Sequence, residues 1–435
     1  MHRIAVGIDT LSLMINRDTY DVIIAGGGPA GSSAAIQLAG DGARVLLVEE
    51  KKFPRPKLCG EFISPECLTH FKRLGVFERM TSAGGAALSE TVFYSGRGRS
   101  VPVPSEWFGT GSTALGLSRS EMDHVLLQRA RDVGVVVAEQ THASGLIQER
   151  GFVRGIRVKN DTGFDDYRSL ITIDATGRVR SLTRHASEMD SRSGLRVRQR
   201  SKITKRPFVA FKTHLENTGA AGGACEIYFY RGGYGGLSGI EGGISNLCFI
   251  VSADEVRRHG SDPEIVMREV LMKNARARDT LRNASATAPW LSVALDTFGS
   301  RTPAPAAGLI SIGDAAAFID PFTGSGMLMA LESGQIAARA IVRHLPQLRL
   351  ADRKAVPAFA KLAQDYQTEY SSTFNSRLRC SALLRRAAFV PFLAEAAILI
   401  FGPSARLRRR LARATRLSGT ILPEPPKVVG GSAAK

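Results

Sequence analysis

Two short apolar runs near the start of the chain have the length and the flanking residues of buried strands. They are YDVIIA at 20–25 and RVLLVE at 44–49, and neither shows a sustained alternation of apolar and polar residues. Nearly continuous apolar runs of this length are typical of strands in parallel sheets, which are covered on both faces. The small and apolar residues of 31–39 lie between them, after a glycine-rich turn. The pattern therefore predicts two parallel strands joined by a helix.

Helical periodicity follows at several later places. Apolar residues recur three residues apart at Leu68, Phe71 and Leu74, as they do on one face of a helix. The segment 118–134 carries serines at its start, acidic residues in its first turn and Gly134 at its end, which are common helix boundaries. Further helices are expected at 261–281, from about Gly326 to His344, and from Ala358 through most of the C-terminal region.

Turn-rich β segments interrupt this pattern twice, at 82–113 and within 191–295. The sequence therefore predicts an α/β fold with α+β inserts: a Rossmann-like nucleotide-binding domain, an inserted antiparallel β-sheet domain for a substrate, and a helical C-terminal tail. The expected parts are an N-terminal extension at 1–18, a discontinuous nucleotide-binding domain at 19–81, 114–190 and 296–345, a substrate domain at 82–113 and 191–295, a helical C-terminal region at 346–418, and a disordered tail at 419–435.

Composition narrows the class of protein. Hydrophobic residues make up 44% and charged residues 23% of the 435 residues, which is ordinary for a globular enzyme. The five cysteines are scattered and form no CxxC pair, which argues against a disulfide framework or a zinc site and favours a reducing compartment. Residues 1–18 lack the apolar core of a secretion signal, so a cytoplasmic location is expected.

The formal net charge of +18 is concentrated near the C-terminus. Between 375 and 416, ten arginines face one acidic residue, Glu395, which gives +9, half of the excess. The apolar run at 387–402 is shorter than the roughly twenty residues of a spanning helix. A basic, apolar tail fits a helix lying on an anionic membrane surface, or one packed on its own core with a solvated basic face. No motif points to a nucleic-acid partner.

A glycine-rich turn, GGGPAG, joins the first strand to its helix. Gly26, Gly28 and Gly31 form the G-x-G-x-x-G pattern, which allows a tight turn, close approach of a pyrophosphate and close packing of the helix. The free N–H groups of the helix start favour phosphate. Glu49 ends the second strand, where a carboxylate can accept hydrogen bonds from a ribose. The motif predicts a dinucleotide but does not separate NAD from FAD.

A second glycine-rich element lies nearly 300 residues later, in GDAAAFIDPFTGSGM at 313–327. Asp314 follows a strand, where a carboxylate can bind the ribitol hydroxyls of a flavin. TGSGM opens a long helix, whose N–H groups can face the flavin N1/O2 region, where negative charge builds on reduction. One extended ligand that spans both elements explains the pair, and that ligand is FAD.

At these residues the sequence resembles the FAD-dependent oxidoreductases of the para-hydroxybenzoate hydroxylase fold, and among them the geranylgeranyl reductase-like branch. The resemblance covers about 20–345 and rests on GGGPAG, KLCGE (57–61), DATGRVRSLTR (174–184) and GDAAAFIDPFTGSGM. Ala317 stands where the aromatic hydroxylases usually carry His, and Met327 follows the last glycine as in the reductases. One departure is the segment 232–246, which lacks the Trp and Pro that prenyl reductases have in this region.

The resemblance implies that the nucleotide-binding domain holds FAD. The implied FAD-binding residues are Gly26, Gly28, Pro29, Ala30, Gly31, Glu49, Glu50, Lys57, Cys59, Gly60, Arg119, Gly177, Gly313, Asp314, Pro321, Gly324, Ser325, Gly326 and Met327. No metal site is expected, because no cluster of His, Cys and carboxylates has metal-ligand spacing.

Three residues are candidates for catalysis. Cys59 matches the Cys-Gly that these reductases carry near the flavin; the alternative is a small buried side chain in a loop. Glu241 lies among glycines in an expected sheet, where burial would raise its pKa and suit a general acid; a structural carboxylate is the alternative. Tyr234 continues a period-two pattern with Tyr228 and Tyr230, so it either packs in the core or turns its hydroxyl to the substrate.

The expected function is that of a reductase in which reduced FAD, regenerated by NAD(P)H, delivers hydride to a hydrophobic substrate such as an isoprenoid, polyketide or lipid. Two alternatives remain open from the sequence. One is a flavin monooxygenase on the same scaffold, and the other is a flavin- or lipid-binding protein without turnover.

Overall fold

The structure is a computed structural model that describes residues 19–108, 112–184, 186, 207–295, 298–350, 355–388 and 390–414. The predicted extension at 1–18 and the predicted disordered tail at 419–435 lie outside these residues, as does part of the predicted substrate domain, at 191–206. The expected domain boundaries remain a prediction.

The predicted parallel unit is present at the start of the described chain. It consists of β1 (Thr19–Ala25), α1 (Pro29–Gly40) and β2 (Val45–Val48), and β1 pairs in parallel with β2. Pro29 occupies the first turn of α1, where its missing N–H group costs no hydrogen bond. The full sheet has the order β8-β2-β1-β11-β10-β9, with β19 on β11. The other strands are β8 (Val136–Ala138), β9 (His142–Glu149), β10 (Phe152–Asn160), β11 (Gly163–Asp174) and β19 (Leu309–Ser311).

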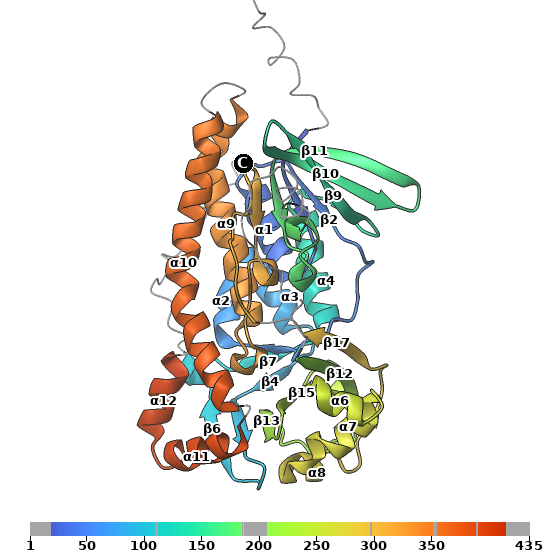
Figure 1. The fold of residues 1–435 in the computed structure, drawn as a ribbon, viewed down its shortest axis with the longest axis vertical. Coiled ribbons are helices and arrows are strands. Elements are labelled where there is room, and N and C mark those ends of the chain that lie inside the picture. Colours follow the sequence, from blue (N-terminus) through green and yellow to red (C-terminus); the bar gives the residue numbers. More distant parts are fainter. Residues whose placement is uncertain are drawn as a thin grey trace, which may run out of the picture.

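Helices cover one face of this sheet (Figure 1). α1 packs against α4 (Arg119–Asp132) and α9 (Gly326–Arg349), and α9 also contacts α2 (Pro65–Leu74). α3 (Phe77–Thr81) follows α2, and a small sheet of β3 (Phe62–Ile63), β7 (Ala114–Gly116) and β4 (Ala86–Leu88) lies nearby. These helices and the sheet enclose the largest apolar core.

A second sheet of eight strands lies at the other end of the molecule. Its order is β16-β12-β15-β14-β13-β5-β6, with β17 on β12. The pairs are antiparallel except that β5 runs parallel to β13, so the predicted antiparallel sheet contains one parallel pair. The strands are β5 (Glu90–Tyr94), β6 (Ser100–Pro104), β12 (Phe208–Glu216), β13 (Ala224–Tyr230), β14 (Gly233–Gly239), β15 (Ser245–Ser252), β16 (Ser285–Ala286) and β17 (Leu291–Leu295). A two-stranded pair is formed by β18 (Gly299–Ser300) and β20 (Ala317–Phe318).

The helix predicted over 261–281 is broken in the structure, so this prediction was wrong in its continuity. α7 (Pro263–Glu269) ends before a short 3₁₀ turn, and α8 (Ala275–Leu281) starts anew. Asn274 causes the restart, because its side-chain oxygen caps Ala277 N while its amide nitrogen donates to the backbone carbonyls of Tyr94, Ser95 and Phe229. Together with α6 (Ala253–Arg258), these helices cover one face of that sheet.

Three helices form the described C-terminal region. α10 (Ala355–Ala388) runs along α9, and α11 (Pro391–Phe401) and α12 (Ala405–Ala414) lie beside β6 (Figure 1). α11 packs on the protein core, because Ala394 and Ile398 are buried in an aromatic cluster, while Phe392 of the same helix is 78% exposed; contact with a membrane stays a prediction. Among the described helices, none is both long enough and apolar enough to cross a membrane.

Candidate active site

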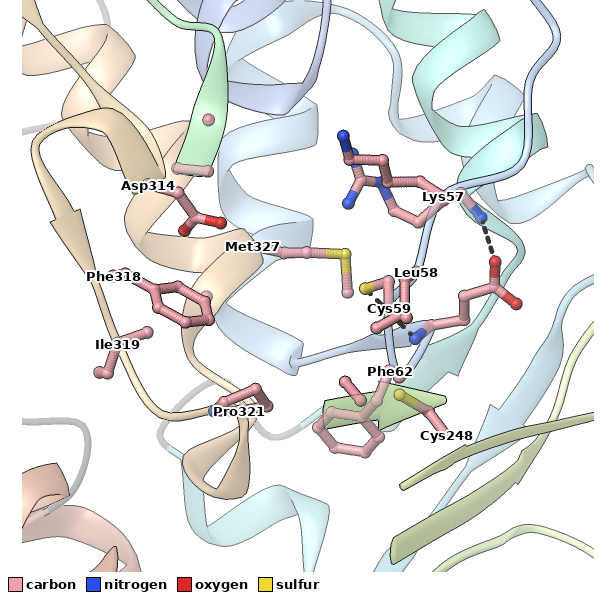
Figure 2. A pocket seen from close by; sticks show the side chains of 18 of the residues that line it. Lys57, Leu58, Cys59, Phe62, Cys248, Asp314, Phe318, Ile319, Pro321 and Met327 are labelled. Carbon is pink, nitrogen blue, oxygen red and sulfur yellow. Dashed lines mark hydrogen bonds between the residues drawn. The ribbon is translucent and has the colours of Figure 1, made fainter. Parts of the chain in front are cut away.

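A cavity of about 880 Å³ lies between the two sheets. At one end it is lined by the glycine-rich turn and the neighbouring strand ends, and at the other by one face of the second sheet together with α11 and α12. The KLCGE loop and the 313–327 loop line the middle, and Figure 2 shows Cys59 and Met327 from these two loops facing each other.

The glycine-rich turn has the shape of a phosphate cradle. Gly26 has φ +109°, and a Cβ atom there would lie 2.3 Å from the Ala175 carbonyl oxygen, so only glycine fits. A Cβ atom on Gly28 would meet nothing closer than Arg119 Nη2 at 3.8 Å, so this backbone faces the open cavity. Glu49 accepts a hydrogen bond from Gly27 N at 2.8 Å, which fixes its carboxylate beside the turn. These residues fit a dinucleotide.

Arg119 begins α4 and is held by a bidentate pair with Asp123. Its Nε and Nη2 donate to the two Asp123 oxygens at 2.8 and 2.7 Å, and Asp123 is fully buried. Arg55 Nη1 lies 3.4 Å from the same carboxylate. The Arg119 guanidinium also interacts with the Cys59 thiol. This pair therefore fixes a cation between the glycine-rich turn and the KLCGE loop.

The 313–327 loop presents a half-buried carboxylate and a helix start to the cavity. Burial raises the pKa of Asp314, while nearby Arg178, Arg119 and Lys57 oppose that shift. Gly324 has φ +60°, which turns the chain into α9, so the first N–H groups of that helix lie next to Gly326 at the cavity wall. Such an arrangement of a carboxylate and helix N–H groups fits the polar side of a flavin.

The second sheet holds the KLCGE loop through its backbone carbonyls. Lys212 Nζ donates to Lys57 O at 3.1 Å, and Asn246 Nδ2 donates to Cys59 O at 3.2 Å. The Lys57 side chain lines the cavity, where desolvation by the surrounding protein and the nearby arginines lower its pKa. The sheet therefore fixes where Cys59 lies in the cavity.

Glu61 is the carboxylate of the KLCGE loop and is 1% exposed. Its Oε1 accepts from Arg119 N at 2.8 Å and from Lys212 Nζ, and its Oε2 bonds His214 Nε2 at 2.8 Å. Burial alone would raise the Glu61 pKa, but the bonds from His214 and Lys212 outweigh burial and lower it. Glu61 is thus an ionised anchor that joins the KLCGE loop and the start of α4 to the second sheet.

One face of the second sheet forms the apolar end of the cavity. Alternate residues point into it, as the pleat of a strand requires; they are Phe93, Val101, Val103, Ala210, Cys225, Ile227, Phe229, Tyr234, Gly236, Ser238, Cys248, Ile250 and Leu295, with Thr91. Burial raises the pKa of the Cys225 and Cys248 thiols to about 12. This end of the cavity therefore suits a hydrophobic molecule.

The structure brings most of the predicted site residues to this one cavity. Gly31 is not at its wall, because its role is packing: a Cβ there would lie 1.9 Å from Gly26 O. Ser325 is buried at the start of α9. The lining residues among those predicted are Gly26, Gly28, Pro29, Ala30, Glu49, Glu50, Lys57, Cys59, Gly60, Arg119, Gly177, Tyr234, Gly313, Asp314, Pro321, Gly324, Gly326 and Met327.

Glu241 is not brought into the cavity. It lies in a 3₁₀ turn after β14, where its carboxylate accepts from Ser118 N at 2.8 Å and supports the start of α4. Arg55 and Asp320 also belong to the site but were not predicted from the sequence, because Asp123 and Tyr234, with which they interact, are distant in the chain. Among the described residues, no group of three His, Cys, Asp or Glu side chains could hold a metal ion.

Comparison with known proteins agrees with this geometry. A digeranylgeranylglycerophospholipid reductase of Methanosarcina mazei is 27% identical over 329 residues, which cover 74% of this chain and 75% of the relative. A menaquinone reductase of Mycolicibacterium smegmatis is 27% identical over 333 residues, covering 73% and 75%. A solved structure of a geranylgeranyl bacteriochlorophyll reductase-like protein from Thermoplasma acidophilum matches with a TM-score of 0.74 at 21% identity, covering 92% of this chain and 96% of that one.

The last likeness concerns the fold, because the sequence identity is low. The family model described as an FAD binding domain matches residues 19–346, most of the chain. The predicted resemblance to FAD-dependent oxidoreductases with a reductase-like branch is thereby confirmed. The chain therefore belongs to the FAD binding domain family, as an FAD-dependent oxidoreductase.

Proposed function

We propose that this protein is a geranylgeranyl reductase-like enzyme that reduces a hydrophobic substrate with electrons from FAD, and that NAD(P)H regenerates the reduced flavin. The observation that carries the proposal is one continuous cavity with two different ends. A glycine-rich turn and fixed charges line one end, and an apolar sheet face lines the other. The named relatives act on isoprenoid lipids or quinones, in keeping with an apolar substrate end.

The proposed cofactor contacts follow from the positions of the side chains. The Gly28 backbone and the N-terminus of α1 would take the pyrophosphate, Glu49 a ribose, and Asp314 the ribitol. The N–H groups at the start of α9 would lie beside the flavin ring, near Cys59 and Met327. When bound, FAD supplies hydride transfer, and the protein's part is to orient the ring, exclude water and manage a proton.

We further propose that α11 and α12 contact an anionic membrane surface. The α11–α12 face, as we name it, combines exposed apolar side chains with exposed arginines: Phe392, Leu393, Leu399, Ile400, Arg406, Arg409, Arg410 and Arg413. Apolar side chains flanked by cations suit the boundary between lipid headgroups and acyl chains. The inner sides of both helices line the cavity, so a lipid-borne substrate would have a short path to it.

The test is an anaerobic turnover assay on purified protein carrying FAD. We expect NADPH or NADH to bleach the flavin spectrum, and menaquinone or geranylgeraniol in detergent to restore it with formation of a reduced product. Product formation that requires oxygen would contradict the proposal and indicate a monooxygenase. A flavin that neither NADPH nor NADH reduces, and that neither substrate reoxidises after reduction by dithionite, would indicate a binding protein without turnover.

A further inference from the structure

Tyr234 and Asp320 form a buried pair at the boundary between the two ends of the cavity. The Tyr234 hydroxyl donates to Asp320 Oδ1 at 2.6 Å, although the two residues are 86 positions apart in the chain. Tyr234 is 5% exposed and lines the cavity. Asp320 is 2% exposed and lies in the loop just before Pro321, behind the cavity wall.

The environment of Asp320 favours a carboxyl group that holds a proton. Its Oδ1 accepts from Tyr234 and from Phe322 N, but its buried Oδ2 accepts no hydrogen bond. Arg385 Nε is the cation facing it, at 3.9 Å. Burial raises the Asp320 pKa, although the two hydrogen bonds and Arg385 oppose the shift. A carboxyl group with one unbonded oxygen in an apolar wall gains from being neutral.

Apolar and aromatic groups surround the pair. The Tyr234 ring meets the Phe322 ring edge-on, with centroids 5.4 Å apart, and both belong to the core that includes Ile250 and Phe229. Burial raises the Tyr234 pKa well above its usual value, and Asp320, Cys248 and Tyr230 add to that shift. The hydroxyl therefore keeps its proton until a reaction draws it away.

We propose that Tyr234 is the catalytic acid of the reduction and that Asp320 is a positioning residue that returns its proton. This inference rests on the proposed function, since that reaction supplies the hydride. One carbon of the substrate double bond gains the hydride from the reduced flavin, and the neighbouring carbon gains the proton of the Tyr234 hydroxyl. The O–H bond breaks, a C–H bond forms, and the phenolate takes the Asp320 proton. Water then reprotonates the Asp320 carboxylate.

Hydrogen-bond direction makes this transfer feasible. An ionised Asp320 only accepts, so the Tyr234 hydrogen points at it and away from the substrate. A neutral Asp320 can donate to the Tyr234 oxygen, which reverses the bond and frees the tyrosine hydrogen for the cavity. The acid is thus active only when Asp320 is protonated. Arg385, whose side chain is 28% exposed, lies on the side from which water can reach the carboxylate.

The first experiment compares Tyr234→Phe with wild type under anaerobic single turnover, starting from reduced flavin and using menaquinone and geranylgeraniol as probes. We expect product formation to slow about 10²- to 10⁴-fold, the range for removal of a general acid. FAD content and the rate of flavin reduction should not change. Tyr230→Phe is the matched control, because Tyr230 is equally buried but donates to Ile250 O on the opposite face of the sheet. A Tyr234→Phe protein that forms product at the wild-type rate overturns the proposal.

The second experiment tests Asp320 through pH dependence. Product formation by wild type should fall as pH rises through the raised Asp320 pKa, because the neutral carboxyl is then lost. Asp320→Asn keeps an acceptor for Tyr234 and Phe322 N but has no carboxyl proton to give. The variant should therefore form product slowly, and its rate should not show this fall with rising pH. Outside the pair, Arg385, Cys248 and Tyr230 are titratable or charged groups that influence it. A fall of the rate with pH that persists in Asp320→Asn would belong to one of them or to Tyr234 and would contradict the assignment.

A third readout needs no substrate. Infrared spectra of the oxidised protein in H₂O and D₂O should contain the carbonyl stretch of a buried protonated carboxyl at neutral pH, and Asp320→Asn should remove it. Absence of that band in wild type overturns the proposal even if the protein is an active reductase. Failure of wild type to reduce either probe, with the band present, counts against the proposed function and leaves the protonated pair supported.

Discussion

Gly31 packs directly on the carbonyl of Gly26. A Cβ atom added to Gly31 would lie 1.9 Å from the Gly26 oxygen, a distance that no side chain tolerates. Gly28, between them in the same motif, has free space around the corresponding position, with Arg119 Nη2 the nearest atom at 3.8 Å. Two glycines of one motif therefore serve the fold and the ligand separately.

This difference predicts that Gly28→Val yields a folded protein without FAD. The valine side chain would occupy the space where we place the pyrophosphate, and its Cβ atom would have Arg119 Nη2 as its nearest neighbour, at 3.8 Å. We expect a colourless protein with wild-type circular dichroism and the Tm of the FAD-free protein. Gly31→Val is the matched comparison, and it should unfold or fail to express. Bound FAD at the wild-type ratio in Gly28→Val would place the pyrophosphate elsewhere.

Asp314→Ala should weaken FAD binding while leaving the fold intact. A hydrogen bond to a charged group contributes about 1.5–3 kcal/mol, so the Kd should rise about 10- to 150-fold. Equilibrium dialysis of the FAD-free protein with FAD measures this change. Asp132→Ala is the control, because Asp132 is an exposed carboxylate of α4 that pairs with Arg79. An unchanged Kd would remove Asp314 from the FAD site.

The sequence predicted the parts of the site that are local in the chain. The strand, turn and helix at 19–40 follow from residues within one short segment, and so do the loop and helix start at 313–327. Contacts that depend on how distant strands and loops pair could not be predicted from the sequence. Tyr234 meets Asp320 only because β14 lies beside that loop, and Glu241 leaves the cavity because a 3₁₀ turn follows β14.

The hydrogen-bonded cluster around Glu61, which stabilises the fold, could not be predicted from the sequence either. The Glu61 partners Lys212 and His214 come from β12, about 150 residues later, so no local pattern in the sequence could reveal this cluster. Since all three are at least partly buried, the bonds hold the KLCGE loop on the second sheet. Because the cluster is buried, removal of one of its charged partners lowers the free energy of unfolding.

Glu61→Gln should therefore destabilise the protein by about 3–5 kcal/mol, because it leaves the buried Lys212 charge without its partner. Urea unfolding followed by circular dichroism measures this change. Asp166→Asn, which breaks the exposed pair with Arg157 on the first sheet, is the control and should leave the midpoint unchanged. A Glu61→Gln midpoint equal to that of the control would mean that the cluster adds nothing to stability.

Because His70 is buried, we expect the free energy of unfolding to decrease at acidic pH. Burial lowers its pKa from 6.5 to about 4, although the bond to Gln335 opposes this shift. The unfolded chain therefore binds a proton more readily than the folded one. The stability contribution is complete above pH 6.5, falls as the pH drops, and is lost once the pH passes below about 4. The full effect of such a shift is about 3 kcal/mol. His70→Asn should flatten the pH dependence of the urea midpoint between these values, and a slope equal to wild type would contradict the assignment.

The α11–α12 face predicts binding to anionic vesicles. Charge reversal by Arg409→Glu with Arg410→Glu should abolish co-sedimentation with vesicles of phosphatidylglycerol and phosphatidylcholine, because each cation near the surface contributes about 1 kcal/mol. Phe392→Ser should weaken binding without changing its salt dependence, since that side chain is 78% exposed and apolar.

Phe164→Ser is the matched control for this experiment, because Phe164 is 64% exposed but lies on β11, in the first sheet. Raising the salt concentration should release wild type from anionic vesicles, since screening weakens the contribution of the arginines. If the Phe164 and Phe392 variants sediment alike, insertion of the α11–α12 face is excluded. If the Arg409 and Arg410 variant still binds anionic vesicles as wild type does, the arginines of α12 face water, and the substrate reaches the cavity without a membrane contact at this face.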